Sequence, residues 1–190
     1  MKTRQLARWT AVLLALMALP LASGAAPAPV PRTGQTVSYR SGDDGDLQPG
    51  VAWPSPRFKD HGNGTVTDRL TGLMWSRNAF PDGVKTNWSG AVDYCTDSLL
   101  AGYDDWRLPS VVELMSLLDY SQKTFLPSGH PFLTPQTEYW TSTSLSSGSA
   151  AWRAQVTGGG QLISAGVTSA FAVWPVRTVS GAVGTLVTIR

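Results

Sequence analysis

The sequence predicts an α+β domain, and three observations carry this prediction. Gly, Pro, Ser and Thr interrupt the chain every few residues, which disfavours an all-helical bundle. Short β runs stand at both ends of the domain, with two amphipathic helical segments between them, an order that differs from the alternation of α/β proteins. With 190 residues, 42% hydrophobic and 15% charged, the chain suits one domain with an arm and is too apolar for a disordered tail.

Residues 1–25 have the three parts of a secretory signal peptide. A basic start precedes an apolar core at residues 10–21, and small residues follow at 22–25. The apolar run is shorter than the roughly 20 residues that span a bilayer. We therefore expect export to the periplasm or the cell exterior, with no membrane span after cleavage. An uncleaved anchor is the alternative.

Cleavage of this segment changes the net charge. It carries Lys2, Arg4 and Arg8, three of the 15 basic residues, which leaves 12 against 13 acidic residues. The bulk charge of the mature chain therefore gives no support for a nucleic-acid partner.

Residues 26–50 are expected to form a linker and an N-terminal arm. Residues 26–31 (APAPVP) are typical of an extended linker, and the rest of the arm is polar and rich in turns. Trp53 is a candidate for packing the arm. The domain then covers residues 51–178, and in the tail at 179–190 the segment TLVTI predicts a terminal strand.

Three short strands open the domain. Residues 57–60 lead into Asn63-Gly64, a dipeptide that suits a type I′ hairpin turn. Residues 65–68 and 73–76 supply the second and third strands, so the first part of the domain is a meander.

Two helices are expected next. Residues 87–99 carry apolar side chains at steps of three and four behind a possible Asn87 N-cap. Residues 110–120 begin with Ser110 and Glu113 at the spacing of a capping box. The expected buried faces are Trp88, Ala91, Val92, Cys95 and Leu99 in the first helix and Val111, Leu114, Met115 and Leu118 in the second. Since the chain has one cysteine, Cys95 is interpreted as a buried thiol, with a reactive or intermolecular thiol as the alternative.

A loop of about 18 residues, rich in Pro and Gly, follows the second helix. Four further β runs, separated by Gly/Ser turns, are expected at residues 139–142, 151–157, 161–165 and 170–176.

Several motifs occur in an order that identifies a family. They are Gly64-Thr65-Val66-Thr67-Asp68, Thr71-Gly72-Leu73-Met74-Trp75, Tyr94-Cys95, the segment GYDDWRLP at 102–109, Glu113-Leu114, Tyr139-Trp140-Thr141-Ser142 and Val173-Trp174-Pro175-Val176-Arg177. The chain closely resembles the C-terminal domain family of the Legionella collagen-like protein over about residues 51–178.

The resemblance implies a fold similar to C-type lectins. In lectins the cysteine of the first helix pairs with one in the last strand, and this chain has no second cysteine. The named family member is an adhesin that binds sulfated glycans and trimerises through collagen repeats. This chain departs from that member because it has no collagen repeats and a mature charge near zero.

The motif residues are expected to hold the fold rather than a ligand. Arg107 should pair with Asp104, Asp105 or Glu113, although a guanidinium can also clamp a carboxylate or sulfate. The full structural set is Trp75, Trp88, Cys95, Asp105, Trp106, Arg107, Glu113, Trp140, Trp174 and Arg177.

No cofactor or metal is expected. Residues 141–172 contain no Asp or Glu, which argues against a calcium lectin site there. Asp43, Asp44 and Asp46 form the densest acidic cluster and are kept as a weak calcium alternative to a solvated turn.

Catalysis is weakly supported. The only two histidines, His61 and His130, lie in a hairpin turn and in the Pro/Gly loop, and no nucleophile elbow is present. We expect a non-enzymatic, exported binding module for a glycan or a protein. Its ligand would contact residues 144–168 through Trp152, Arg153 and Gln155, because an aromatic ring beside polar groups suits sugars.

Two alternatives remain. The first is a structural or assembly domain of the envelope, in which the arm or the terminal strand adds to a partner's sheet. The second is a hydrolase. The oligomeric state is left open by the sequence.

Overall fold

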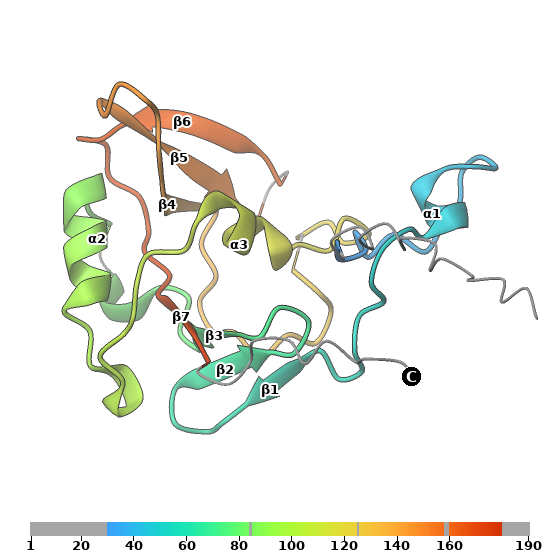
Figure 1. The fold of residues 1–190 in the computed structure, drawn as a ribbon, viewed down its shortest axis with the longest axis horizontal. Coiled ribbons are helices and arrows are strands. Elements are labelled where there is room, and N and C mark those ends of the chain that lie inside the picture. The colour runs from blue at the N-terminus through green and yellow to red at the C-terminus, as the bar shows by residue number, and fades with distance from the viewer. Residues whose placement is uncertain (1–29, 84, 125, 158–159, 180–190) are drawn as a thin grey trace, which may run out of the picture.

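The computed structural model describes residues 30–83, 85–124, 126–157 and 160–179, and these form an α+β fold with two antiparallel sheets (Figure 1). The expected signal segment and terminal strand lie outside the described residues. No helix among the described residues is long and apolar enough to cross a membrane.

The first sheet joins the two ends of the domain. Its strand order is β1-β2-β3-β7, with β1 Phe58–Asp60, β2 Thr65–Asp68, β3 Leu73–Ser76 and β7 Val176–Thr178. Trp75 in β3 pairs with Val66 on one side and with Val176 on the other. Every residue of β3 is buried because the strand lies in the middle of the sheet.

The β1–β2 hairpin differs from the predicted type I′ turn. Positive φ occurs at Gly62 (72°) and Gly64 (88°) and not at Asn63, and the His61 amide donates to the Thr65 carbonyl at 3.0 Å. The loop therefore has three residues. Asn63 stays outside the left-handed region while its Oδ1 accepts from both the amide (3.2 Å) and the hydroxyl (2.7 Å) of Thr65.

The second sheet is a meander of β4 Glu138–Ser144, β5 Ala150–Gln155 and β6 Leu162–Gly166. Much of the expected ligand-binding region at 144–168 is thus a β-hairpin. The strand expected at 170–176 is shorter, because only Val176 of that run belongs to β7. Pro175 precedes it and has no N–H for a ladder hydrogen bond.

Both main helices begin at their predicted caps and end earlier than expected. In α2 (Trp88–Thr96) the Asn87 side chain accepts from the Gly90 amide at 2.8 Å. The chain leaves this helix at Asp97, so Leu99 is 72% exposed and not part of the buried face.

Helix α3 (Val111–Ser116) begins with the complete Ser110–Glu113 capping box. It ends well before residue 120 because the amides of Leu117 and Leu118 bond to carbonyls three residues back, which tightens the last turn.

The core lies between the sheets and is centred on aromatic rings. Trp174 contacts Trp75, Phe132 and Tyr139 at ring-centroid separations of 5.5, 4.8 and 5.2 Å. A second cluster gathers Ala91, Cys95, Leu108, Trp140, Ala151 and Val173. Of the five tryptophans expected in the core, Trp75, Trp106, Trp140 and Trp174 are buried and Trp88 is half-buried.

The arm folds against the domain. It contains the single-turn helix α1 (Asp44–Leu47), which Figure 1 shows beyond the two sheets at the far end of the molecule. The Trp53 indole donates to the Arg32 carbonyl at 2.9 Å, and the Tyr120 amide donates to the Thr33 carbonyl at 3.0 Å. Trp53 therefore packs the arm, as the sequence indicated.

Candidate functional site

The ion pairs of the family motifs hold the loop before α3. Arg107 donates to both carboxylate oxygens of Glu113 at 2.7 and 2.5 Å, so Glu113 is its partner among the three that the sequence predicted. Arg177 in β7 donates to both carboxylate oxygens of Asp105 at 2.5 and 3.1 Å. Since each guanidinium fork is occupied, these motif residues support the fold.

A cleft of about 500 Å³ is partly lined by the start of this loop, at Ser98, Leu99 and Leu100, and its volume is within the usual size range of ligand sites. The loop after β3, the end of α2 and the segments before β4 and β7 contribute to its walls. The lining residues are Gly64, Ser76, Arg77, Asn78, Pro81, Asp82, Tyr94, Ser98, Leu99, Leu100, Leu133 and Pro175.

Asp82 and Tyr94 form a hydrogen-bonded pair in the lining of this cleft. The Tyr94 hydroxyl donates to Asp82 Oδ2 at 2.8 Å, joining the short 3₁₀ turn η1 (Pro81–Gly83) to α2. Two further cavities, of about 240 and 360 Å³, are also lined by both residues. The pair therefore lies at the meeting point of a branched depression.

Asp82 occupies an unusual backbone conformation. Its φ of 59° falls in the left-handed region, where a residue with a side chain is uncommon. Such positions recur at binding sites, because the surrounding structure holds them in place.

The loop that carries Asp82 is fixed at several points. The Ser76 hydroxyl donates to the Asn78 carbonyl at 2.8 Å. The Ala79 amide donates to the Leu133 carbonyl at 2.9 Å, and the Leu133 amide donates to the Arg77 carbonyl at 2.8 Å. These bonds fix the backbone of Arg77 and Asn78, which both line the cleft.

The cleft offers both charged and neutral polar groups beside apolar surface. Burial and the bond to Asp82 raise the pKa of the Tyr94 phenol, which therefore stays protonated at physiological pH. Asp82 is exposed, as are the apolar side chains of Leu99 and Leu133. This arrangement suits a ligand with both hydroxyl or amide groups and a CH-rich face.

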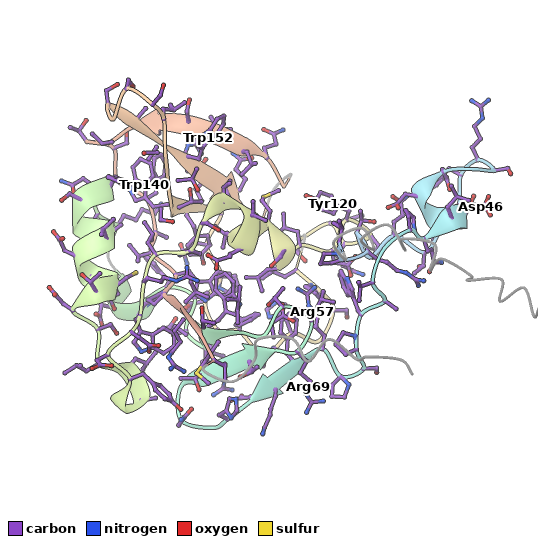
Figure 2. All side chains as sticks on the ribbon, in the orientation of Figure 1. Asp46, Arg57, Arg69, Tyr120, Trp140 and Trp152 are labelled. Atoms are coloured by element: carbon purple, nitrogen blue, oxygen red, sulfur yellow. The ribbon has the colours of Figure 1, made fainter. Side chains whose placement is uncertain are left out.

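The structure does not bring the three sequence-predicted ligand residues onto one surface. Trp152 and Arg153 are consecutive in the regular part of β5, where they pair with Ser164 and Ile163, so their side chains face opposite sides of the sheet. Figure 2 places Trp152 on the sheet of β4–β6.

Arg153 and Gln155 both point to one internal acceptor. Glu138 Oε1 accepts from Arg153 Nη1 and, at 3.1 Å, from Gln155 Nε2, while the guanidinium carbon lies 4.7 Å from the centre of the Phe171 ring. The three predicted ligand residues stay a prediction, with Trp152 on one face and the Glu138 cluster on the other.

The acidic cluster of the arm serves its own local fold. Asp43 caps α1 by accepting from the Asp46 amide at 2.9 Å, Asp44 accepts from the Thr33 hydroxyl, and Asp46 accepts from the Gly42 amide at 2.8 Å. Among the described residues, no group of three or more His, Cys, Asp and Glu side chains is placed to hold a metal ion.

The remaining reactive candidates lie outside the cleft. His61 Nε2 bonds the Thr67 hydroxyl at 2.9 Å, and His130 stacks on Phe132. Cys95 is fully buried, and burial raises the pKa of its thiol to about 12, in line with the buried-thiol interpretation.

Sequence reasoning missed the Asp82–Tyr94 pair. In the sequence, Tyr94 stands out only as a motif residue beside Cys95. Pro81-Asp82-Gly83 has the composition of a turn, which gives no indication of the helix that Asp82 faces.

Fold and site together define an α+β domain with two antiparallel sheets, whose polar cleft lies where a strand-to-helix loop meets the first main helix. The family model of the Lcl C-terminal domain matches residues 64–177, and the chain belongs to this family. The match includes every residue that lines the cleft. None of the curated proteins compared with the chain matches it.

Proposed function

We propose that this protein is an exported, non-enzymatic binding module with a C-type-lectin-like fold, and that it holds an uncharged, hydroxyl-rich ligand such as a glycan beside Tyr94. The observation that carries this proposal is the Asp82–Tyr94 pair at the junction of three cavities. A neutral phenol, a carboxylate and nearby leucine side chains are the groups that bind hydroxyls and CH faces.

Three features support a lectin-like architecture. The last strand returns to pair with the opening meander, two helices intervene, and a separate small sheet follows them in the chain. Family membership and the signal-like residues 1–25 support an exported adhesin-like module.

Binding rather than catalysis is supported by the chemistry of the lining. The lining residues that the structure describes include no histidine and no cysteine, and the pKa of the Tyr94 phenol is raised. A phenol that stays protonated is a weak nucleophile even beside a carboxylate, which favours binding over catalysis. Recovery of the bound ligand chemically unchanged after prolonged incubation would support this part of the proposal.

The test is a glycan array with residues 26–190, read in EDTA and again in Ca²⁺, followed by titration of the ligand found. Tyr94→Phe and Asp82→Asn should each weaken binding about 5- to 10-fold, the effect of losing one hydrogen bond. Tyr39→Phe changes an exposed tyrosine of the arm and is the matched control.

Two outcomes would contradict the assignment. Binding that Trp152→Ala abolishes, while both cleft variants retain it, would place the site on the second sheet. An array without any retained glycan, in either buffer, would contradict a glycan ligand.

A second candidate function, an assembly domain of the envelope, is favoured by the outer edge of β6. In the described residues no strand pairs with this edge, and Leu162–Gly166 carries no charged side chain or proline to protect it. Strand addition there would give an oligomer on size-exclusion chromatography that Ser164→Pro converts to a monomer. A monomer at all concentrations would contradict this function.

A further inference from the structure

A separate depression lies at the junction of the arm and the first sheet. It encloses about 480 Å³ and shares no lining residue with the Tyr94 cleft. Figure 2 shows Arg57 at this junction, close to β1 and β2. The walls are rich in rings: Trp53, Pro54, Pro56, Phe58, Pro127 and Pro131. We call this depression the Arg57 groove.

Arg57 is a buried cation with one unpartnered nitrogen. Its side chain is 5% exposed, and Asp68 accepts from Nε at 3.0 Å and from Nη2 at 2.8 Å. Nη2 also donates to the Ser116 carbonyl at 2.6 Å. Nη1 is buried without a hydrogen-bond partner. A buried donor without an acceptor is energetically unfavourable. An acceptor from outside the chain would therefore stabilise this nitrogen.

The acceptor that fits is a neutral oxygen. Asp68 already neutralises the guanidinium, so an added phosphate or sulfate would be an uncompensated anion beside Asp60 and Asp119 in the same wall. A carbonyl oxygen accepts from Nη1 without bringing a charge.

The carboxylates of the groove are engaged and do not suit a saccharide. Asp60 accepts from the Gly62 amide at 2.9 Å and pairs with Arg77 at 2.9 Å. Asp119 Oδ1 accepts from the Ser121 amide and hydroxyl at 2.9 and 2.6 Å. A sugar needs several free polar partners for its hydroxyls, and both carboxylates of this groove already accept hydrogen bonds from the chain.

We infer that the Arg57 groove binds a proline-rich peptide segment in the polyproline II conformation. Such a segment has backbone carbonyls free of internal hydrogen bonds and rings that pack against aromatic and proline walls. One carbonyl accepts from Arg57 Nη1. The Trp53 ring lies over the guanidinium at 4.4 Å, so this binding mode requires the ring to shift.

The experiment is an NMR titration of the mature chain, residues 26–190, with decaproline as the probe. A (Gly-Ser)₅ peptide is the control for unspecific contact. The expected result is a saturable shift of the Trp53 indole and Arg57 Nε–H signals with decaproline alone. Arg57→Lys should abolish it, because lysine keeps the charge but has no second nitrogen to donate.

A blocking variant covers the case in which Arg57→Lys does not fold. Ser128 is exposed on the rim of the groove, so Ser128→Arg fills the groove without touching the core, and it should weaken decaproline binding at least tenfold. Ser146→Arg, at an exposed position of the β4–β5 turn, is the matched control and should bind as the unmodified chain does.

The outcomes separate this inference from the proposed function. Tyr94→Phe should leave decaproline binding unchanged. No saturable shift at Trp53 and Arg57, equal binding by Ser128→Arg, or a neutral oligosaccharide that shifts these signals where decaproline does not would each overturn the peptide assignment.

Discussion

Arg177 in β7 forms an ion pair with Asp105, which lies 72 residues earlier in the chain. Its Nε and Nη2 donate to the two carboxylate oxygens at 2.5 and 3.1 Å, and its guanidinium carbon lies 3.8 Å from the centre of the Tyr103 ring. The Arg177 side chain is 8% exposed and that of Asp105 is 48% exposed. The pair therefore fixes β7 to the loop before α3 without relying on a disulfide.

Asp105→Asn should lower the free energy of unfolding by about 1–2 kcal/mol, because it leaves a buried guanidinium without its countercharge, while the half-exposed partner limits the loss. Urea unfolding followed by tryptophan fluorescence measures it. Asp104→Asn, at the exposed neighbouring position, is the control. An equal loss in both variants would show that the ion pair contributes nothing specific.

Acid should destabilise the domain through two carboxylates. The hydrogen bond from Arg177 holds the pKa of Asp105 below its usual value. Burial opposes ionisation of Glu113, yet the hydrogen bonds from Arg107 and Ser110 hold the pKa of Glu113 below its usual value as well. A depressed folded-state pKa gives stability that is present above the unfolded value, about 4, and lost as the pH falls through the folded value. Urea midpoints should drop below about pH 4, and the double variant Asp105→Asn/Glu113→Gln should give a flatter profile. If the double variant has the same pH dependence of the urea midpoint as the unmodified chain, then other groups cause the acid sensitivity.

Ser110→Ala should cost about 1 kcal/mol of stability because it removes the hydroxyl that accepts from the Glu113 amide at the start of α3. The denaturant midpoint measures this loss. Ser146→Ala, in an exposed turn, should change the midpoint little. A midpoint for Ser110→Ala equal to that of the control would mean that packing alone sets the start of the helix.

Cys95 should not react with a thiol reagent in the folded protein at pH 8. Its side chain is fully buried, and burial raises the thiol pKa to about 12, so little thiolate is present. The absorbance of the aromatic thiolate released from an aromatic disulfide reagent measures the reaction. The same sample in denaturant should react completely. Rapid labelling without denaturant would contradict the buried-thiol assignment.

Gly45→Ala should open the arm while leaving both sheets intact. A Cβ at Gly45 would collide with the Val37 carbonyl, a backbone group that cannot rotate away. Limited proteolysis should then cut within residues 33–50 faster than in the unmodified chain. Gly166→Ala is the matched control, because a Cβ there meets no atom within 4 Å. Equal cleavage of both variants would indicate that the arm tolerates the added carbon.

Local spacing explains which features could be predicted from the sequence. The Asn87 cap, the Ser110–Glu113 capping box and the Arg107–Glu113 pair each join residues at most six positions apart. The succession of strands and helices along the chain follows from hydrophobic patterning, and the tryptophans expected in the core are those of the family motifs. Helix ends were less well predicted, since Leu99 continues the apolar pattern beyond the point where the chain leaves the helix.

Tertiary structure decided the sites. It brought Asp82 to Tyr94, Arg57 to Asp68 and to the carbonyl of Ser116, and it turned Trp152 away from Arg153. The physical reason is that a capping bond depends on backbone geometry within one turn of the chain. A cleft instead depends on how separate segments pack after the sheets have closed, and no local pattern records that arrangement.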